Sequence, residues 1–193
     1  MRIFFTGDTH YGHANVIKYA KRLFSSVEEM NSEMVRRWNE VVTKDDLVYI
    51  VGDFAFCKPE QAVNIVRSLH GRKRIVFGNH DKQLRKNRMF LMQFEAAADY
   101  MEIKVPDTTA PGGKHQRITL LHYAMRVWNT AHHGSWQLYG HSHGTLPDWP
   151  NALQLDVGVD CWNFTPVSYE TIKERMALKT WKPVDHHGQD RDE

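Results

Sequence analysis

Cysteine is nearly absent from this sequence, with Cys57 and Cys161 as its two representatives. Two isolated cysteines cannot build a disulfide framework or a cysteine-rich zinc site. Neither has a neighbouring motif partner that would activate it as a nucleophile, which argues against a covalent cysteine mechanism. Because so little cysteine is typical of a reducing compartment, we expect a cytoplasmic protein.

Long apolar runs and a strong net charge are missing too. The apolar stretch Ile3-Phe4-Phe5 ends at Thr6, just before Gly7-Asp8, so it is far shorter than a signal-peptide core or a membrane span. We therefore expect neither export nor membrane insertion. The 25 basic and 23 acidic residues give a formal charge of +2, which is too small to imply a polyanionic partner by itself.

The bulk composition is that of an ordinary globular protein. Hydrophobic residues make up 41% and charged residues 25% of 193 residues, enough to bury one sizeable core. No internal repeat or low-complexity segment interrupts the chain. We expect a single domain over residues 1–182 and a polar, mobile tail over residues 183–193.

The first half of the sequence alternates between short apolar runs and amphipathic stretches. This alternation predicts right-handed crossovers and a largely parallel sheet. Ser26 and Glu29 form a capping-box pattern, and Pro59 suits the first turn of a helix. The predicted strands are 2–6, 47–51 and 74–77, and the predicted helices are 14–23, 27–41, 59–70 and 81–94.

The second half has more strand-like runs and looks more antiparallel. Pro111-Gly112-Gly113 lies within residues 106–116, which we interpret as a hairpin loop. A last helix is predicted over residues 168–178. The predicted strands are 100–105, 118–122, 137–140 and 153–157.

Five of the apolar runs end in side chains that bind metal ions. Aspartate, asparagine and histidine hold hard or borderline divalent ions, and in four of the runs a glycine stands just before the ligand. A residue without Cβ lets the backbone turn sharply while the ligand points into a crowded site. The five places are Gly7-Asp8-Thr9-His10, Gly52-Asp53, Gly78-Asn79-His80-Asp81, His122 and Gly140-His141-Ser142-His143.

The combination is far more specific than its parts. A lone Asp-x-His is common on solvated loops, and His-x-His is only a little stronger. All five in this order, each after an apolar run, predict a two-metal hydrolase site at the carboxyl edge of a sheet.

With these motifs the sequence resembles the calcineurin-like metallophosphoesterase superfamily, and the match spans residues 6–143. Within the superfamily, the sequence most resembles the small single-domain bacterial and phage members. The residues that carry this resemblance are Asp8-Thr9-His10-Tyr11-Gly12-His13, His122-Tyr123 and Val157-Gly158-Val159-Asp160. The resemblance implies an α/β four-layer sandwich, with two mixed sheets flanked by helices.

The resemblance also implies a division of the ligands between two ions. Asp8, His10 and His143 would bind one ion, Asn79, His122 and His141 the other, and Asp53 would bridge them. A bridging carboxylate and a bridging hydroxide offset the repulsion between two cations, and the hydroxide would serve as the nucleophile. Manganese is favoured for the two divalent ions, with iron, nickel and zinc as alternatives.

By the same resemblance His80 is not a ligand but a catalytic residue. It would act as a general acid toward the leaving oxygen or stabilise the transition state. The serine/threonine phosphatases of the superfamily carry an aspartate that orients this histidine, and Phe56 stands in its place here. A protein phosphatase is therefore not expected. Asp81 could orient His80 instead, or could serve as an N-terminal acid or cap of the following helix.

Several further residues allow two interpretations each. His13 could face the substrate or simply open the next helix. Arg126 could hold a phosphate oxygen or form a surface salt bridge. Asp160 could support a metal ligand or cap a turn. A basic run could form a nucleic-acid lip or a solvated helix face; it consists of Arg72, Lys73, Arg74, Lys82, Arg85, Lys86 and Arg88.

The sequence thus predicts a metal-dependent hydrolase of phosphate esters, with diesters favoured as substrates. A phosphomonoesterase or a nuclease would share the same metal site, although a nucleic-acid partner is not favoured. A non-enzymatic scaffold is less consistent with the full set of ligands. A metallo-β-lactamase type of hydrolase would need a His-x-His-x-Asp-His run, which is absent. The native substrate and the oligomeric state are left open.

Overall fold

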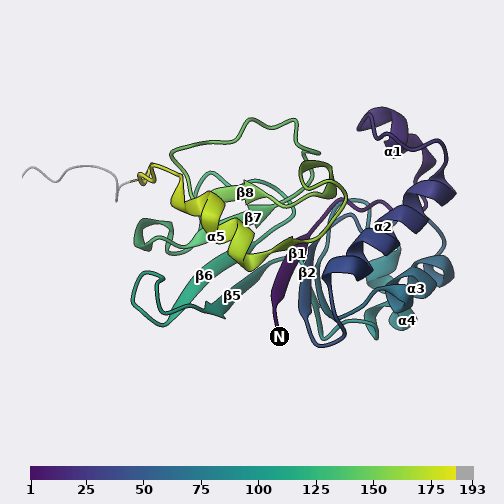
Figure 1. Cartoon of the computed structure of the whole chain (residues 1–193), viewed down its shortest axis with the longest axis horizontal. Coiled ribbons are helices and arrows are strands. Elements are labelled where there is room, and N and C mark those ends of the chain that lie inside the picture. Colours follow the sequence, from purple (N-terminus) through teal and green to yellow (C-terminus); the bar gives the residue numbers. More distant parts are fainter. Residues whose placement is uncertain (186–193) are drawn as a thin grey trace, which may run out of the picture.

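The structure is a computed structural model that describes residues 1–185. Two mixed β-sheets pack face to face, and most helices lie beyond the first sheet (Figure 1). The predicted α/β class with two mixed sheets is confirmed. The tail predicted over residues 183–193 lies outside the described residues from residue 186 onward.

The first sheet has the strand order β4-β3-β2-β1-β9. Four of its strands are parallel, and β9 pairs with β1 in the antiparallel sense. All five residues of β2 are buried, as expected for a strand covered on both faces. The strands are β1 (Ile3–Thr6), β2 (Leu47–Val51), β3 (Arg72–Val76), β4 (Ala96–Ala98) and β9 (Val167–Ser168).

The second sheet has the strand order β5-β6-β7-β8. Only the pair β5–β6 is antiparallel, whereas β6–β7 and β7–β8 are parallel. The second half was expected to be more antiparallel, and this holds for β5–β6 but not for the other two pairs, because the loops after β6 and β7 are long enough to carry the chain back for parallel pairing. The strands are β5 (Met101–Pro106), β6 (His115–Leu120), β7 (Trp136–Tyr139) and β8 (Gln154–Asp156).

The helices begin where local capping signals stand. The Ser26 hydroxyl accepts a hydrogen bond from the N–H of Glu29 at 3.1 Å, and Pro59 is the first residue of α3, as predicted. Within residues 1–185 the α-helices are α1 (Ala14–Tyr19), α2 (Val27–Val41), α3 (Pro59–Ser68), α4 (Arg88–Leu91) and α5 (Tyr169–Ala177), with short 3-10 helices at Leu84–Lys86, Ala131–His133 and Val159–Cys161.

One predicted helix, over residues 81–94, is not continuous. The carboxylate of Asp81 is bonded to backbone of other loops, and Asn87 has an extended backbone and caps a new helix through the N–H of Phe90. Asparagine often competes with helical hydrogen bonding in this way. The segment therefore consists of turns, one 3-10 turn and the four-residue α4, followed by the unpredicted strand β4.

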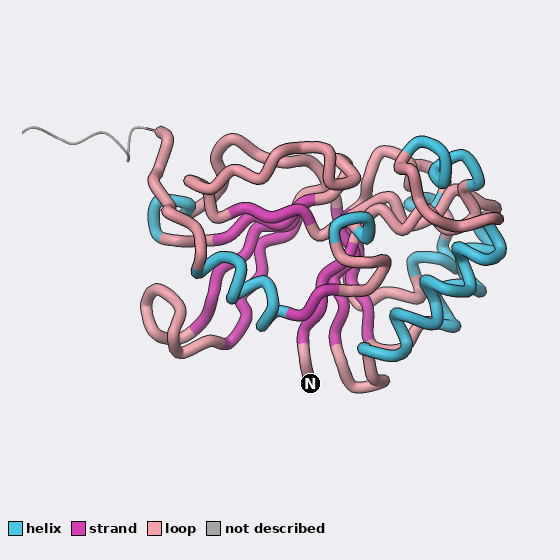
Figure 2. Tube along the Cα trace, turned by 45° about the horizontal axis from the view of Figure 1, so that its top comes forward, coloured by secondary structure: helices cyan, strands magenta, loops and turns pink. Residues whose placement is uncertain are grey.

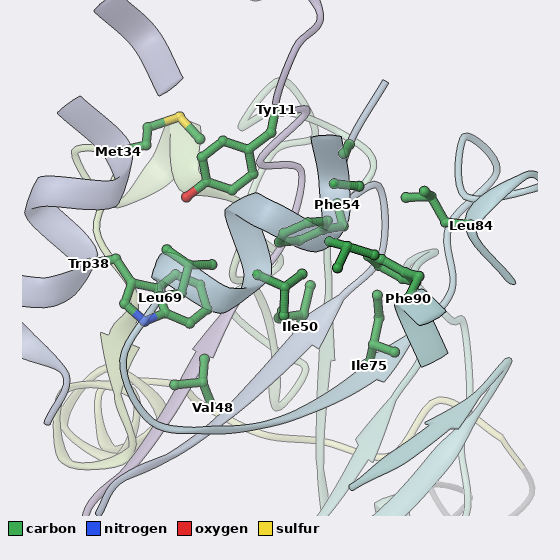
Figure 3. Packing of buried hydrophobic residues seen from close by; sticks show 14 of the residues in the cluster. Tyr11, Met34, Trp38, Val48, Ile50, Phe54, Leu69, Ile75, Leu84 and Phe90 are labelled. Atoms are coloured by element: carbon green, nitrogen blue, oxygen red, sulfur yellow. The ribbon is translucent and has the colours of Figure 1, made fainter. Parts of the chain in front are cut away.

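Each face of the first sheet has its own core. Val48 and Ile50 face α2 and α3, where they pack with Trp38 and Phe54 (Figure 3). Tyr49 and Val51 face the second sheet. Helix α5 joins this inter-sheet core, and its Tyr169 ring stacks on Trp136 with centroids 5.5 Å apart.

The parallel strands of both sheets end on one side of the molecule, where the connecting loops gather (Figure 2). At that side an isolated bridge pairs Gly7, after β1, with Gly158, after β8. The two sheets are thus joined where the predicted ligands follow their strands.

Candidate metal centre

The seven predicted ligands and His80 all follow the carboxyl ends of strands. β1, β2 and β3 supply one group from the first sheet, and β6 and β7 supply the other from the second sheet. The crevice at the strand ends is where open α/β sheets bind their ligands. The residues are Asp8 and His10, Asp53, Asn79 and His80, His122, and His141 and His143.

These side chains form two clusters with metal-binding geometry. In each cluster the potential ligand atoms lie within 4.8 Å of one another. The first consists of Asp8, His10 and His143, and the second of Asp53, His122 and His141. Because His10 Nε2 lies 3.5 Å from Asp53 Oδ2, the clusters adjoin.

Asn79 lies at the second cluster. Its Oδ1 is 3.2 Å from His122 Nε2, which in turn is 3.3 Å from Asp53 Oδ2. The hydroxyl of Tyr123, a residue whose role the sequence did not indicate, donates to the same Asn79 oxygen at 3.3 Å.

The residues present fit divalent ions. The buried Nε2 of His10 has no hydrogen-bond partner within residues 1–185, although such atoms are nearly always paired. It faces the oxygen of a buried carboxylate. Mixed oxygen and imidazole nitrogen donors suit first-row divalent ions, so the two clusters are consistent with a dimetal site.

Within the second cluster, an ion pair joins Asp53 from the first sheet to His122 from the second sheet. Burial alone would raise the pKa of Asp53, but the hydrogen bond with His122 lowers it to about 2. Burial would conversely lower the pKa of His122, and the same partner raises it to about 9. For Asp8, burial outweighs the opposing effect of His122 and His143 and raises the pKa to about 7.

The backbone at the ligands is strained. A positive φ is costly for residues with a Cβ, yet five ligand candidates adopt it, with φ between 47° and 68°. Strain of this kind persists where the surrounding structure enforces it, most often at functional sites. The five are Asp8, His10, Asp53, His141 and His143.

The glycines before the ligands mainly provide space. A Cβ at Gly78 would lie 2.1 Å from Asp53 Oδ1, and one at Gly140 would lie 2.6 Å from Asp8 Oδ2. Of the four motif glycines only Gly52 has a positive φ, at +84°. The expected sharp turns are therefore made mostly by the candidate ligands themselves, and Gly78 and Gly140 prevent collisions with carboxylates.

A buried ion-pair chain supports the first cluster. His143 Nδ1 lies 2.7 Å from Asp160 Oδ2, which favours the support role foreseen as one option for Asp160. Arg22 donates to both Asp160 oxygens at 2.8 Å and to the carbonyls of Asp8 and Thr9 at 2.6 and 3.0 Å. The sequence contains no signal for Arg22, which stands in an ordinary Lys-Arg pair at the end of a helical stretch.

His80 lies at the rim of the site and is exposed. Its backbone N–H donates to Asp53 Oδ1 at 2.8 Å, which ties the segment to the second cluster. The ring of Phe56 lies beside it with centroids 5.6 Å apart.

Asp81 serves neither of the roles considered for it. Its carboxylate accepts hydrogen bonds from the N–H groups of Gly78, Asp53 and Phe54 at 2.8 to 3.0 Å. It thereby joins the loops after β2 and β3, and it is not bonded to the His80 ring.

The two candidate substrate-binding residues lie in different places. His13 lies in the site, with its Nδ1 3.4 Å from His10 Nδ1 and its ring 4.5 Å from that of Phe56. Arg126 instead lies over the Trp149 ring at 4.9 Å, and within residues 1–185 no hydrogen bond or ion pair joins it to the site.

The predicted basic run is broken up by acidic partners. Arg72 and Arg74 both pair with Glu95, and Arg85 pairs with Asp99. Lys73 is buried and donates to the carbonyl of Gly71. The run does not form one uncompensated surface for a nucleic acid.

No helix within the described residues has the length and apolar character that a bilayer crossing requires.

Comparison with known proteins agrees with the fold and the site. An uncharacterized protein of Methanocaldococcus jannaschii is 32% identical over 178 residues, which cover 89% of each chain. The gene 66 protein of Mycobacterium phage L5 is 31% identical over 180 residues, which cover 82% of this chain and 86% of the phage protein.

Among solved structures, a protein of unknown function from Aquifex aeolicus has the same fold. It superposes with a TM-score of 0.65 at 19% identity and covers 90% of this chain and 98% of its own. Residues 1–154 match the calcineurin-like phosphoesterase superfamily domain. This match, together with the archaeal relative, means that the chain belongs to the calcineurin-like phosphoesterase superfamily.

Proposed function

We propose that this protein hydrolyses phosphate diesters with two divalent metal ions. The observation that carries the proposal is the pair of adjoining clusters, with Asp53 within reach of histidines from both and His80 bonded to it at the rim. One ion would be held by Asp8, His10 and His143, the other by Asn79, His122 and His141, with Asp53 between them. Two such ions, when bound, supply an activated water and neutralise charge on the phosphate.

The chain itself would orient the ligands and transfer a proton. Asp160 and Arg22 hold His143 in one ring orientation, which preorganises a ligand as supporting partners of metal-bound histidines do. His80, exposed and next to the centre, is positioned to give a proton to the leaving oxygen of the substrate.

Two features favour a diester over a monoester. A monoester carries an additional negative charge, which arginine usually binds. The Arg22 guanidinium is already used by Asp160 and two carbonyls, and Arg126 lies over Trp149. A diester, with a single charge, needs no such partner.

The test measures metal content and turnover in the same samples. With added manganese, we expect faster hydrolysis of bis(p-nitrophenyl) phosphate than of p-nitrophenyl phosphate. His80→Ala should retain both ions and lose about 100-fold in turnover, whereas Asp53→Asn should lose metal and activity together. His115→Ala, which changes a histidine outside the site, is the control.

Three outcomes would contradict parts of the proposal. Asp53→Asn with unchanged metal content and activity would disprove the dinuclear centre. Loss of metal in His80→Ala would make His80 a ligand. Faster hydrolysis of the monoester would identify a phosphomonoesterase, and no metal-dependent turnover of either compound would favour a non-enzymatic role.

A further inference from the structure

A cavity of about 550 Å³ opens directly beside the candidate centre. Asn79 and His80 form one wall, and the lining continues through Phe56, Lys58 and Lys82. The cavity therefore adjoins the side of the site where a leaving group would accept a proton from His80. It belongs to the loops after β2 and β3, which Asp81 joins together.

An aromatic side chain stands at this cavity. Phe56 is 53% exposed, although a ring of this size is usually buried. It is held between His13 and His80, with ring centroids 4.5 and 5.6 Å away. A fixed and accessible ring is a surface on which another planar ring can stack.

The cavity is also positively charged. Lys58 and Lys82 line it, and no aspartate or glutamate does. Neither lysine forms an ion pair in the part of the chain that the structure describes, in contrast to Arg72, Arg74 and Arg85 nearby. The cavity thus combines one accessible ring with two free ammonium groups.

We infer that this cavity is a leaving-group subsite for an alcohol that carries a planar aromatic ring and a further phosphate, such as a nucleoside phosphate. The inference rests on the proposed hydrolysis, because the place of His80 identifies the leaving side. Water would add to phosphorus, the bond from phosphorus to the leaving oxygen would break, and that oxygen would take up a proton. The ring would stack on Phe56, and the lysines would bind the second phosphate.

Binding of a product-like probe to the full-length, metal-free protein tests the subsite separately from catalysis. Without ions, phosphate cannot be captured by the metal centre. Adenosine 3′-monophosphate carries both ring and charge, adenosine only the ring, and ribose 5-phosphate only the charge. We expect the affinity measured by calorimetry to be highest for adenosine 3′-monophosphate.

Matched variants separate the two contributions. Phe56→Leu keeps an apolar side chain and should raise the Kd of adenosine 3′-monophosphate about tenfold, and Phe56→Trp should restore it. Lys58→Gln with Lys82→Gln should raise the Kd about fivefold at low salt and remove most of its salt dependence. Lys86→Gln changes a nearby exposed lysine outside the cavity and should leave the Kd unchanged.

Binding of a dinucleotide is compared with binding of a ten-nucleotide single strand that has the same terminal nucleotide. The comparison distinguishes a small ester from the end of a strand as the occupant. Tighter binding of either supports the subsite and identifies its source, whereas binding of neither overturns it. Equal affinity for adenosine 3′-monophosphate and ribose 5-phosphate, or an unchanged Kd in Phe56→Leu, also overturns it. If the protein hydrolyses bis(p-nitrophenyl) phosphate but does not distinguish these probes in binding, the subsite is wrong and the proposed function is unaffected.

Discussion

Among individual residues, two glycines are points at which the candidate centre should be sensitive to change. Gly78 and Gly140 have ordinary φ values, so their importance lies in the carboxylate oxygens that a Cβ would meet. Gly112 has a positive φ of +86° but open space around it. The two kinds of glycine can therefore be separated experimentally.

Gly78→Ala should abolish binding of the metal ions without unfolding the protein. Its Cβ would lie 2.1 Å from Asp53 Oδ1 and 2.6 Å from the Asp53 nitrogen, so the carboxylate must move. Gly112→Ala should cost about 1 kcal/mol of stability through backbone strain and keep the metal. Metal analysis together with urea unfolding provides the comparison, and a Gly78→Ala protein with full metal content would contradict the steric argument.

Arg22→Met should destabilise the protein by about 3–5 kcal/mol, the usual cost of removing one partner of a buried ion pair. Asp160 would lose its guanidinium, and the carbonyls of Asp8 and Thr9 would lose their donors. Urea unfolding of the metal-free protein measures this cost. Arg36→Met, at an exposed pair with Glu33, is the control and should cost less than about 1 kcal/mol.

A second substitution checks the coupling. Arg22→Met combined with Asp160→Asn should cost less than the sum of the two single changes, because the isolated charge is then removed. Simple additivity would indicate that Arg22 acts mainly through packing. The sequence indicated Asp160 as a possible support of a ligand, but its pairing with Arg22 could not be predicted, since the two residues are 138 positions apart.

At the level of secondary structure, the connection between α2 and β2 depends on a single carboxylate. Asp46 accepts hydrogen bonds from the N–H groups of Arg2 and Thr43 and from the side chains of both residues. Burial alone would raise the pKa of Asp46, but these donors bring it well below its usual value. The carboxylate thereby links the start of β1 to the turn before β2.

Asp46→Asn should therefore change how stability depends on pH. Because the pKa of Asp46 is lower in the folded state than the unfolded value of about 3.9, its contribution is present above about pH 4 and is lost as the pH falls toward the folded pKa. The variant should lose about 2 kcal/mol at pH 7 and less at pH 2.5. Urea unfolding at both pH values measures this, and an equal loss at both would argue against the charge.

How well the elements could be predicted depended on how local their signals are. Ser26 and Pro59 mark helix starts through neighbours within one turn, so α2 and α3 were predicted well. Asp81 looked like a helix-starting acid because its actual partners, Asp53 and Phe54, are 27 and 28 positions away. The two-residue strand β9 and the parallel pairing of β6 with β7 likewise depend on distant contacts. The candidate ligands could be predicted from sequence because each group follows its own apolar run.

For the whole molecule, bound ions should hold the two sheets together. The candidate ligands after β1 and β2 belong to the first sheet, and those after β6 and β7 to the second. An ion that binds only the folded state stabilises it in proportion to the logarithm of its concentration. Metal binding should therefore be visible in global unfolding.

Manganese at about 100 times its Kd should add about 2.7 kcal/mol of stability and raise Tm by roughly 5–10 °C for a chain of this size. The Tm should fall back after chelation. Asp53→Asn should show little of this increase, and Lys86→Gln should show all of it. Differential scanning calorimetry across a manganese series measures the effect, and a Tm independent of manganese would exclude ion binding that favours the folded state.

The five candidate ligands with a left-handed backbone also bear on how such a sequence would diverge. Glycine adopts this conformation at little cost, so glycine at Asp8, His10, Asp53, His141 or His143 would relax the backbone while removing a candidate ion ligand. Selection for a stable backbone and selection for the proposed reaction would therefore act in opposite directions at the same positions. A descendant no longer selected for that reaction should accumulate glycine there first, while its architecture stayed the same.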